Sequence, residues 1–336
     1  MFIVASLLTS FLLSLLFTPI AKNIALRFMI LDVSNTNLKT HKINTPYLGG
    51  LSIFVSVLIA STFIIFLYKI MIPFVVYGLL TSCFIIIALG FTDDIYKLRP
   101  LTKISFQIIA ASLAWTAGIR ITLTGLEQLD IILTITWIVS LSNAFNLIDI
   151  MDGLASGVAA ISSFFLSLIC LELGDIMNGL LLLSIAGACF GFLKFNFNPA
   201  QIFMGDTGSL FLGFLIACST TQMFQYKEYS LEVLPVIILG IPIFETIFIS
   251  LLRIKSGIPP WKGTKDHFAL RLVKLGFSVK STVILTYLFC VFLGSISLIF
   301  FYSRSPILYC FFLITVILTL IGWILSKVDI TDTQHS

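Results

Sequence analysis

Residues 281–301 read STVILTYLFCVFLGSISLIFF, a run of 21 residues without a charged side chain. About 20 apolar residues in a helix cross a hydrocarbon core roughly 30 Å thick, so this run predicts a membrane-spanning helix. Ten further stretches, separated by charged residues or by Pro and Gly, support the same interpretation. The eleven predicted spans are 2–20, 48–68, 73–92, 104–119, 127–141, 155–174, 177–193, 209–224, 232–252, 281–301 and 306–326.

The composition also indicates an integral membrane protein. Hydrophobic residues make up 58% of the 336 residues and charged residues 11%, and the mean hydropathy is +1.09. That leaves too little polar surface to cover a soluble globule. The sequence shows no internal repeat and no inserted soluble domain, so we predict one all-α, polytopic membrane domain over 1–336. The two shortest stretches, 104–119 and 127–141, also fit tilted or re-entrant segments.

The basic residues predict the orientation of the chain. With the N-terminus outside, 16 of the 20 Lys and Arg residues fall in loops on one side, which identifies that side as cytoplasmic. The C-terminus is then cytoplasmic as well. The net charge of +4 follows mostly from this topology, so it requires no nucleic-acid partner.

Five aspartates lie where apolar runs end, namely Asp93, Asp94, Asp149, Asp152 and Asp206. A carboxylate at the edge of a span is costly unless water, a cation or a partner charge holds it. All five fall on the predicted cytoplasmic side, although only basic residues were used to orient the chain. The sequence therefore predicts a metal or phosphate site that faces the cytoplasm.

Asp93 and Asp94 are adjacent, and their mutual repulsion amounts to a few kcal/mol at an effective dielectric of about 20. Both stay ionised only beside a counter-charge, such as a divalent ion or Lys97. One carboxylate of such a pair can hold metal while the other accepts a proton. In the loop before the second span, Lys42 and His41 offer donors to an anion, although this loop alone also fits a basic segment that only sets topology.

Polar residues recur every third position in Asn143-Ala-Phe-Asn-Leu-Ile-Asp-Ile-Met-Asp152. In a helical segment, Asn143, Asn146 and Asp149 would share one face, as would Asp149 and Asp152. Amides and carboxylates among apolar neighbours need a polar ligand to satisfy them. We therefore count all four as candidate site residues.

The segment Gly205-Asp-Thr-Gly-Ser209 directly precedes a predicted span. Small, donor-rich residues at a helix N-terminus are typical of phosphate-binding sites. Because a bare carboxylate would repel that phosphate, Asp206 implies a metal ion between the two. Magnesium suits an oxygen-rich site without zinc-ligand spacing, and manganese is a substitute.

The fifth inner loop carries His267 and Arg271, four residues apart. On a short helix they would face one substrate, with a titratable donor and a fixed cation for a pyrophosphate. A lone histidine is as often structural. Glu245 is the one acidic residue well inside a span, and it fits a functional role or a structural hydrogen bond with Thr246 or another helix equally well.

These motifs resemble the polyprenyl-phosphate N-acetylhexosamine-1-phosphate transferase superfamily, in particular the bacterial undecaprenyl-phosphate N-acetylglucosamine-1-phosphate transferases of glycosyltransferase family 4. The resemblance covers about residues 39–276. In chain order, the matching residues are Lys42, Thr45-Pro46, Gly49-Gly50, Asp93-Asp94, Lys97, Asn143, Asn146, Asp149, Asp152-Gly153-Leu154, Asn196, Pro199-Ala200 and Phe203–Ser209.

The resemblance implies that a UDP-N-acetylhexosamine donates its sugar-1-phosphate to undecaprenyl phosphate and that UMP is released. This reaction is the first membrane step of a cell-envelope polysaccharide such as lipopolysaccharide or teichoic acid. The implied location is the bacterial inner membrane, with the active site facing the cytoplasm. The expected partners are the two substrates, the membrane lipids and a second copy of the chain in a homodimer.

The resemblance also implies roles for individual residues. Asp206 would hold Mg²⁺ on the donor pyrophosphate, and Asp93 or Asp94 would deprotonate or position the acceptor phosphate. Phe203 would stack on uracil with Asn196 nearby. The two lysines named above, Lys42 and Lys97, would steady phosphates.

The fifth loop departs from the family pattern, because many relatives carry two or three closely spaced histidines there and this chain carries only His267. That difference favours the N-acetylglucosamine branch over the phospho-N-acetylmuramoyl-pentapeptide transferases. Two other classes remain as alternatives. One is an ion-coupled transporter or flippase, which usually places its charges near the midplane, and the other is a different magnesium-dependent membrane transferase.

Overall fold

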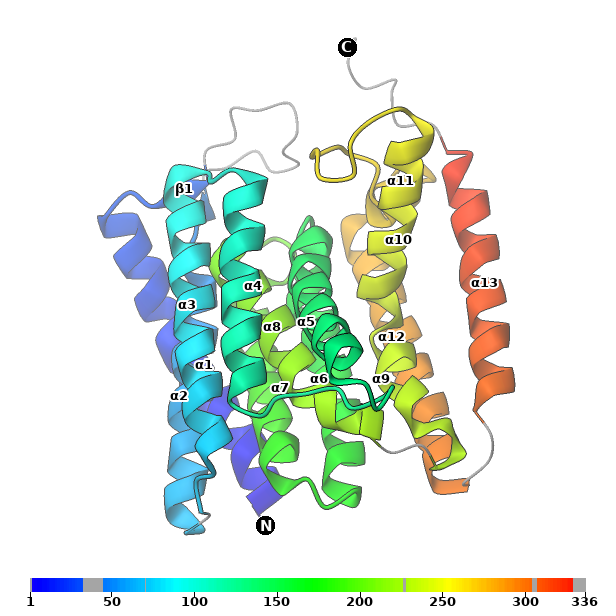
Figure 1. Ribbon diagram of the computed structural model, residues 1–336. Coiled ribbons are helices and arrows are strands. Elements are labelled where there is room, and N and C mark those ends of the chain that lie inside the picture. The colour runs from blue at the N-terminus through cyan, green and yellow to red at the C-terminus, as the bar shows by residue number, and fades with distance from the viewer. Residues whose placement is uncertain (1, 33–44, 70, 226–227, 304–306, 329–336) are drawn as a thin grey trace.

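The computed structural model describes residues 2–32, 45–69, 71–225, 228–303 and 307–328. The described chain is almost entirely helical (Figure 1). The helices are α1 (Phe2–Arg27), α2 (Gly49–Leu67), α3 (Phe74–Tyr96), α4 (Pro100–Thr116), α5 (Glu127–Ile148), α6 (Leu154–Glu172), α7 (Ile176–Asn196), α8 (Gly205–Thr220), α9 (Leu234–Ile238), α10 (Gly240–Lys255), α11 (Phe268–Lys274), α12 (Val279–Ser303) and α13 (Leu308–Ser326). Two 3-10 helices, η1 (Thr221–Gln225) and η2 (Glu228–Val233), and a two-stranded antiparallel pair, β1 (Leu31–Asp32) and β2 (Thr45–Pro46), complete the fold.

The predicted all-α, multi-pass membrane fold is confirmed. Within the described part of the chain, nine helices are long and apolar enough to cross a membrane, and one bent pair raises the number to ten. The one predicted span that is not among these ten is 104–119. It belongs to α4, which has only 17 residues. The start of α1 and the end of α13 lie at opposite ends of the bundle (Figure 1). The count of eleven and the orientation in the membrane stay predictions.

The stretch 232–252, expected as one span, is broken. Residues 231–238 and α10 meet at an angle of 68° around Leu239. Pro242 has no N–H with which to bond the carbonyl of Ile238, so the helix cannot continue straight through this point. The break gives α10 a direction of its own.

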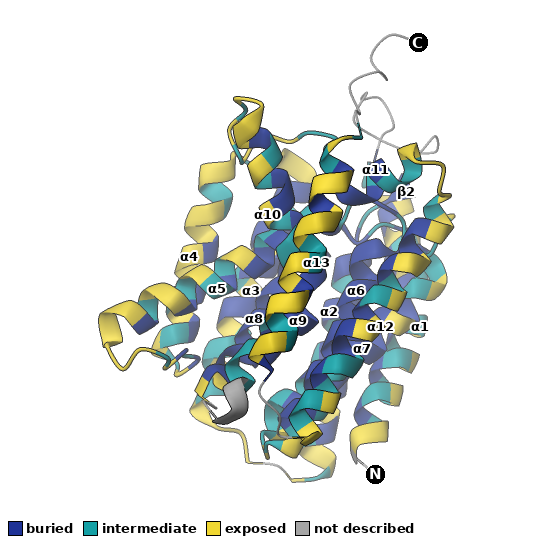
Figure 2. Ribbon diagram, turned by 90° about the vertical axis from the view of Figure 1, so that its right-hand side faces the viewer, coloured by how far each residue is buried: buried dark blue, intermediate teal, exposed yellow. Residues whose placement is uncertain are grey.

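Helix α8 lies at the centre of the bundle, where buried residues are concentrated (Figure 2). A Cβ atom at Gly50 would overlap the backbone nitrogen of Gly208, and one at Gly90 would lie 2.5 Å from the Cα atom of Thr207. Glycine permits this backbone contact. The N-terminus of α8 is therefore held directly between α2 and α3.

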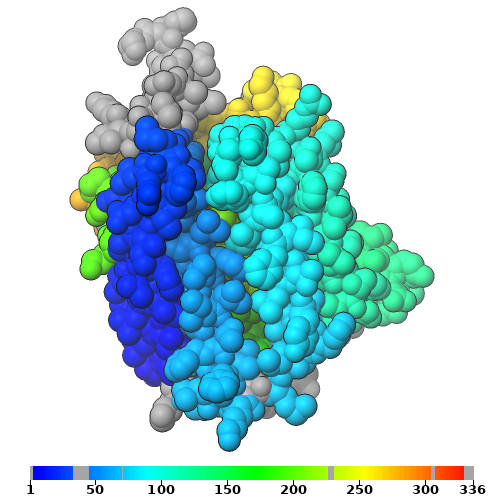
Figure 3. Space-filling model, turned by 90° about the vertical axis from the view of Figure 1, so that its left-hand side faces the viewer, coloured from blue at the N-terminus to red at the C-terminus, as the bar shows by residue number. Residues whose placement is uncertain are grey.

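The segment before α2 pairs with the segment before α8. The N–H of Phe203 donates to the carbonyl of Pro46 at 2.9 Å, and the N–H of Gly49 donates to the carbonyl of Phe203 at 3.0 Å. These bonds fix Phe203 at the entrance of α8. On the outside, α1, α2 and α3 form one face of the molecule, and the connection between α4 and α5 projects beside it (Figure 3).

Candidate active site

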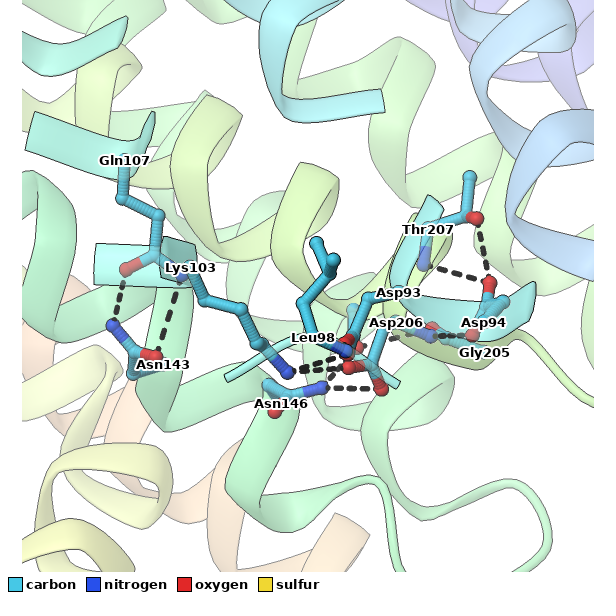
Figure 4. Close-up of polar contacts among 11 residues, drawn as sticks. Asp93, Asp94, Leu98, Lys103, Gln107, Asn143, Asn146, Gly205, Asp206 and Thr207 are labelled. Carbon is cyan, nitrogen blue, oxygen red and sulfur yellow. Dashed lines mark hydrogen bonds and ion pairs between the residues drawn. The ribbon is translucent and has the colours of Figure 1, made fainter. Parts of the chain in front are cut away.

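An ammonium group lies between two of the predicted aspartates (Figure 4). Lys103 Nζ is 2.7 Å from Asp93 Oδ2 and 2.6 Å from Asp206 Oδ2. The second oxygen of Asp93 accepts a hydrogen bond from the N–H of Leu98 at 2.6 Å. The ends of α3, α4 and α8 thus bring two carboxylates onto a single cation.

Asp206 also contacts α5, because Asn146 Nδ2 donates to its Oδ1 at 3.0 Å. Asp206 is the one residue of α8 that is not fully buried, and its side chain is 28% exposed. Asn143 points elsewhere, since its Nδ2 donates to Gln107 Oε1 of α4 at 2.6 Å (Figure 4). Three residues span about 300° of a helix, so the two amides diverge by about 60° and face different neighbours.

Asp94 anchors the N-terminus of α8. Its Oδ1 accepts from the N–H of Asp206 at 2.8 Å, and its Oδ2 accepts from the N–H and the Oγ1 of Thr207 at 3.1 and 2.6 Å. A carboxylate supplied by α3 thereby satisfies donors that have no partner within the helix and lies at the positive end of its dipole. The adjacent aspartates therefore do different work: Asp94 holds the helix and Asp93 faces the cation.

Asp152 and Asn196 hold the backbone beside the cavity. Asp152 Oδ2 accepts from Asn198 Nδ2 and from the N–H of Ala200, both at 2.9 Å. Asn196 is buried, and its Oδ1 accepts from the N–H of Gly153 at 3.1 Å. These bonds connect the α5–α6 turn to the α7–α8 loop. Direct contact of either side chain with substrate stays a prediction.

Asp149 follows α5 and differs from the other four aspartates. No donor in the described part of the chain bonds its carboxylate, and the side chain lines a cavity. Burial, together with the charges of Asp206, Asp94 and Asp152, raises the pKa of Asp149 to about 8. A carboxyl group that binds a proton this readily and faces an open space is suited to accept one from a ligand.

The cavity has a volume of about 310 Å³, and six of the predicted residues line it, namely Asp149, Asp152, Asn196, Phe203, Asp206 and His267. Its acidic and basic lining residues include Asp149, Asp152, Asp206, Lys265 and His267. The cavity lies where chain segments far apart in sequence meet. Charged and aromatic side chains together suit a polar ligand better than a purely apolar one.

Two aromatic residues form another wall of the cavity. The rings of Tyr47 and Phe203 have centroids 6.3 Å apart and are tilted by 56°. Lys97 is exposed and lies over the Tyr47 ring, with Nζ 5.5 Å from the ring centroid. Burial and then the charges of Asp94 and Asp206 raise the pKa of Tyr47, so its phenol keeps its proton.

His267 lines the cavity and Arg271 does not. His267 has extended backbone angles and precedes α11, so the four-residue spacing rule of a helix does not apply to it. The guanidinium group of Arg271 donates to Asp266 Oδ1 at 3.0 Å and to the carbonyl of Leu325 at 3.0 Å. Arg271 thus connects α11 to the end of α13, and its expected contact with a pyrophosphate stays a prediction.

Comparison with known proteins shows the family. Residues 75–224 match the model for glycosyl transferase family 4. A probable undecaprenyl-phosphate N-acetylglucosaminyl 1-phosphate transferase of Bacillus subtilis is 36% identical over 314 residues, which cover 90% of this chain and 86% of the relative. The chain belongs to glycosyl transferase family 4.

Two further proteins are also similar to this chain. The decaprenyl-phosphate N-acetylglucosaminephosphotransferase of Mycolicibacterium smegmatis is 33% identical over 298 residues, with 76% of this chain and 72% of the relative covered. A phospho-N-acetylmuramoyl-pentapeptide-transferase of Caldanaerobacter subterraneus is 34% identical over 209 residues, with 55% and 63% covered.

Membership confirms the superfamily expected from the motifs and shows that the protein is an enzyme, a phosphosugar transferase. It therefore favours the transferase interpretation over the ion-coupled transporter. Lys42, one of the residues expected at the site, lies outside the described residues.

Lys103 and Tyr47 are among the residues of this site that were not expected from the sequence. Lys103 was counted only as a topological charge, and Tyr47 was not considered. A signal for Lys103 exists in hindsight, because it lies at the start of α4, where a cation opposes the helix dipole and therefore calls for an acidic partner. The signal for Tyr47 is weaker and consists of an aromatic residue two positions before a glycine pair.

Proposed function

We propose that this enzyme transfers N-acetylglucosamine-1-phosphate from UDP-N-acetylglucosamine to undecaprenyl phosphate and releases UMP. The proposal rests on the cavity in which Asp149, Asp206 and His267 meet, in a chain 36% identical to a Bacillus subtilis protein named for this transfer. The reaction would take place at the cytoplasmic face of a bacterial inner membrane, as the first membrane step of an envelope polysaccharide.

The location of the cavity suits a reaction between one lipid-soluble and one water-soluble substrate. Asp93 lies near the end of α3, Asp149 follows α5, and Asp206 begins α8. A phosphate carried by a polyprenyl chain stays at the membrane interface, and a nucleotide sugar arrives from water. Their phosphates can meet only where spans end, and positioning is the main requirement of phosphoryl transfer.

The residues present fit a magnesium ion. Asp93 and Asp206 already bracket one positive charge, the ammonium group of Lys103, and both offer oxygen ligands. No group of three His, Cys, Asp or Glu side chains in the described ranges could hold a metal by itself. Mg²⁺ is usually held by one or two carboxylates together with substrate phosphates, so Asp206 with Asp93 is a sufficient protein contribution. The ion would neutralise charge on the donor pyrophosphate.

The remaining side chains divide the work. Asp149 accepts the proton of the acceptor phosphate, because its carboxyl group binds a proton readily and has no partner in the described structure. This assignment replaces the earlier expectation for Asp93 or Asp94, whose oxygens are already engaged. Lys103 and His267 supply positive charge or donors to phosphate oxygens, and the Tyr47–Phe203 wall holds the uracil ring.

The test uses purified enzyme with Mg²⁺, undecaprenyl phosphate and a panel of UDP-sugars. We expect UMP and a lipid-linked sugar pyrophosphate with UDP-N-acetylglucosamine, and no turnover with EDTA. Asp206→Asn and Asp175→Asn form a matched pair of variants. Asp206 lines the cavity, whereas Asp175 precedes α7, at the end of that helix far from the cavity. The Asp206 variant should be inactive and the Asp175 variant active. Absence of product with every UDP-N-acetylhexosamine would rule out the proposal, and turnover only with the muramoyl-pentapeptide donor would reassign the substrate.

A further inference from the structure

Glu245 is a fully buried carboxylate in α10, with 0% of its surface exposed. Burying such a group is costly unless donors compensate it. Both of its oxygens are used at the start of α11: Oε1 lies 2.8 Å from His267 Nδ1, and Oε2 accepts from the N–H of Phe268 at 3.3 Å. The carboxylate is therefore committed to the residue that lines the cavity and to the residue after it.

The contact between Glu245 and His267 determines which ring nitrogen of the imidazole is available to a ligand. A carboxylate only accepts hydrogen bonds, so His267 Nδ1 carries the proton that lies between the two groups. Nε2 is then the ring nitrogen left for a ligand. His267 lines the cavity and Glu245 does not. The acidic residue can affect the cavity only through the histidine.

The loop that carries His267 makes a second contact with α10. The α10–α11 loop folds back along the helix, and Arg253 Nε donates to Thr264 Oγ1 at 3.1 Å. Thr264 and His267 both line the cavity. Two side chains of α10, Arg253 and Glu245, therefore hold the cavity-lining loop at two points.

We propose that Glu245 is a positioning residue of the transferase. Its carboxylate accepts the Nδ1 proton and fixes the ring orientation of His267, so that Nε2 faces the bound substrate, where its N–H, in the doubly protonated ring, donates to a phosphate oxygen. This inference rests on the proposed function. Glu245 is the acidic residue inside a predicted span for which the sequence allowed either a functional or a structural role. The proposal gives it a role in the reaction.

The first test is Glu245→Gln, with Glu172→Gln at the end of α6 as the matched control. Loss of a partner that orients an active-site histidine lowers activity by about 10–100-fold, so we expect kcat for UMP release to fall by that factor. The inhibition constant of uridine should stay within about twofold, because uridine has no phosphate for His267 Nε2 to meet. A general structural defect would change both quantities, and wild-type kcat in Glu245→Gln would overturn the proposal.

The second test is a double-mutant cycle. In a His267→Asn background, Glu245→Gln should change kcat by less than about twofold, because the group it positions is gone. Equal fold-losses in both backgrounds would overturn the positioning role. Failure of the wild-type enzyme to release UMP would instead contradict the proposed function.

A third comparison leaves the buried carboxylate intact and serves if Glu245→Gln does not fold. Asn at position 267 places an amide nitrogen near the position of Nδ1, whereas Gln places one near the position of Nε2. The proposal expects His267→Gln to retain more activity than His267→Asn. The reverse order would overturn it.

Discussion

Replacing Lys103 by methionine removes the positive charge that separates two carboxylates while keeping most of the side-chain volume. The ammonium group lies 2.7 and 2.6 Å from Asp93 and Asp206, and its side chain is only 17% exposed. Removing one partner of a buried ion pair costs about 3–5 kcal/mol. Because the Asp206 side chain keeps 28% exposure, water can compensate part of the loss, and we expect about 3 kcal/mol. At roughly 2 °C per kcal/mol, Tm would fall by about 6 °C.

The assay is thermal unfolding of the detergent-solubilised protein, followed by tryptophan fluorescence in EDTA. Lys97→Met is the matched control, because Lys97 is exposed and lies over the Tyr47 ring rather than between carboxylates. Addition of Mg²⁺ should raise Tm more in Lys103→Met than in the wild-type protein, since a divalent ion would supply the missing charge. Equal Tm losses in the two lysine variants would refute the reasoning, and so would a Mg²⁺ response that the Lys103 exchange leaves unchanged.

Three further predictions concern other parts of the site. Asp149→Asn should lower kcat by about 10³-fold without lowering Tm, because it removes a proton acceptor rather than a structural contact; turnover within tenfold of wild type would exclude that role. With limiting Mg²⁺, kcat/KM should rise with pH through about 8, since Asp149 must lose its proton to act as a base, and added Mg²⁺ should move this limb to lower pH; persistence of the limb in Asp149→Asn would contradict its assignment. Asp94→Asn should cost about 2 kcal/mol, seen as a Tm lowered by about 4 °C, because an amide cannot accept from all three donors at the start of α8; an unchanged Tm would show that this anchor is dispensable.

The sequence predicted the helices well because each apolar run has few alternatives in a membrane. The convergence of the aspartates was predictable too, since each lies at a boundary of an apolar run and the basic residues place all these boundaries on one side. The break at Leu239 had a visible signal in Gly240 and Pro242, but a hydropathy window does not detect a change of direction.

The division of labour within the site was not predictable. Neighbouring residues on a helix point about 100° apart, so Asp93 and Asp94 face different partners, and only the packing of α8 decides which one meets the cation. The same applies to Asn143 and Asn146. Lys103 belongs to a helix that the sequence treats as an ordinary apolar span, and its ion pair with Asp206 joins residues 103 positions apart.

The close contact of α2 and α3 with the start of α8 limits how the sequence can vary. Gly50, Gly90 and Gly208 meet backbone directly, and a methyl group at any of them would displace the turn that carries Asp206. In a library of random variants, these glycines would be as intolerant to substitution as the acidic residues. A map of mutational sensitivity would therefore outline a larger active site than the one that touches substrate, and loss of activity at these positions would report backbone packing.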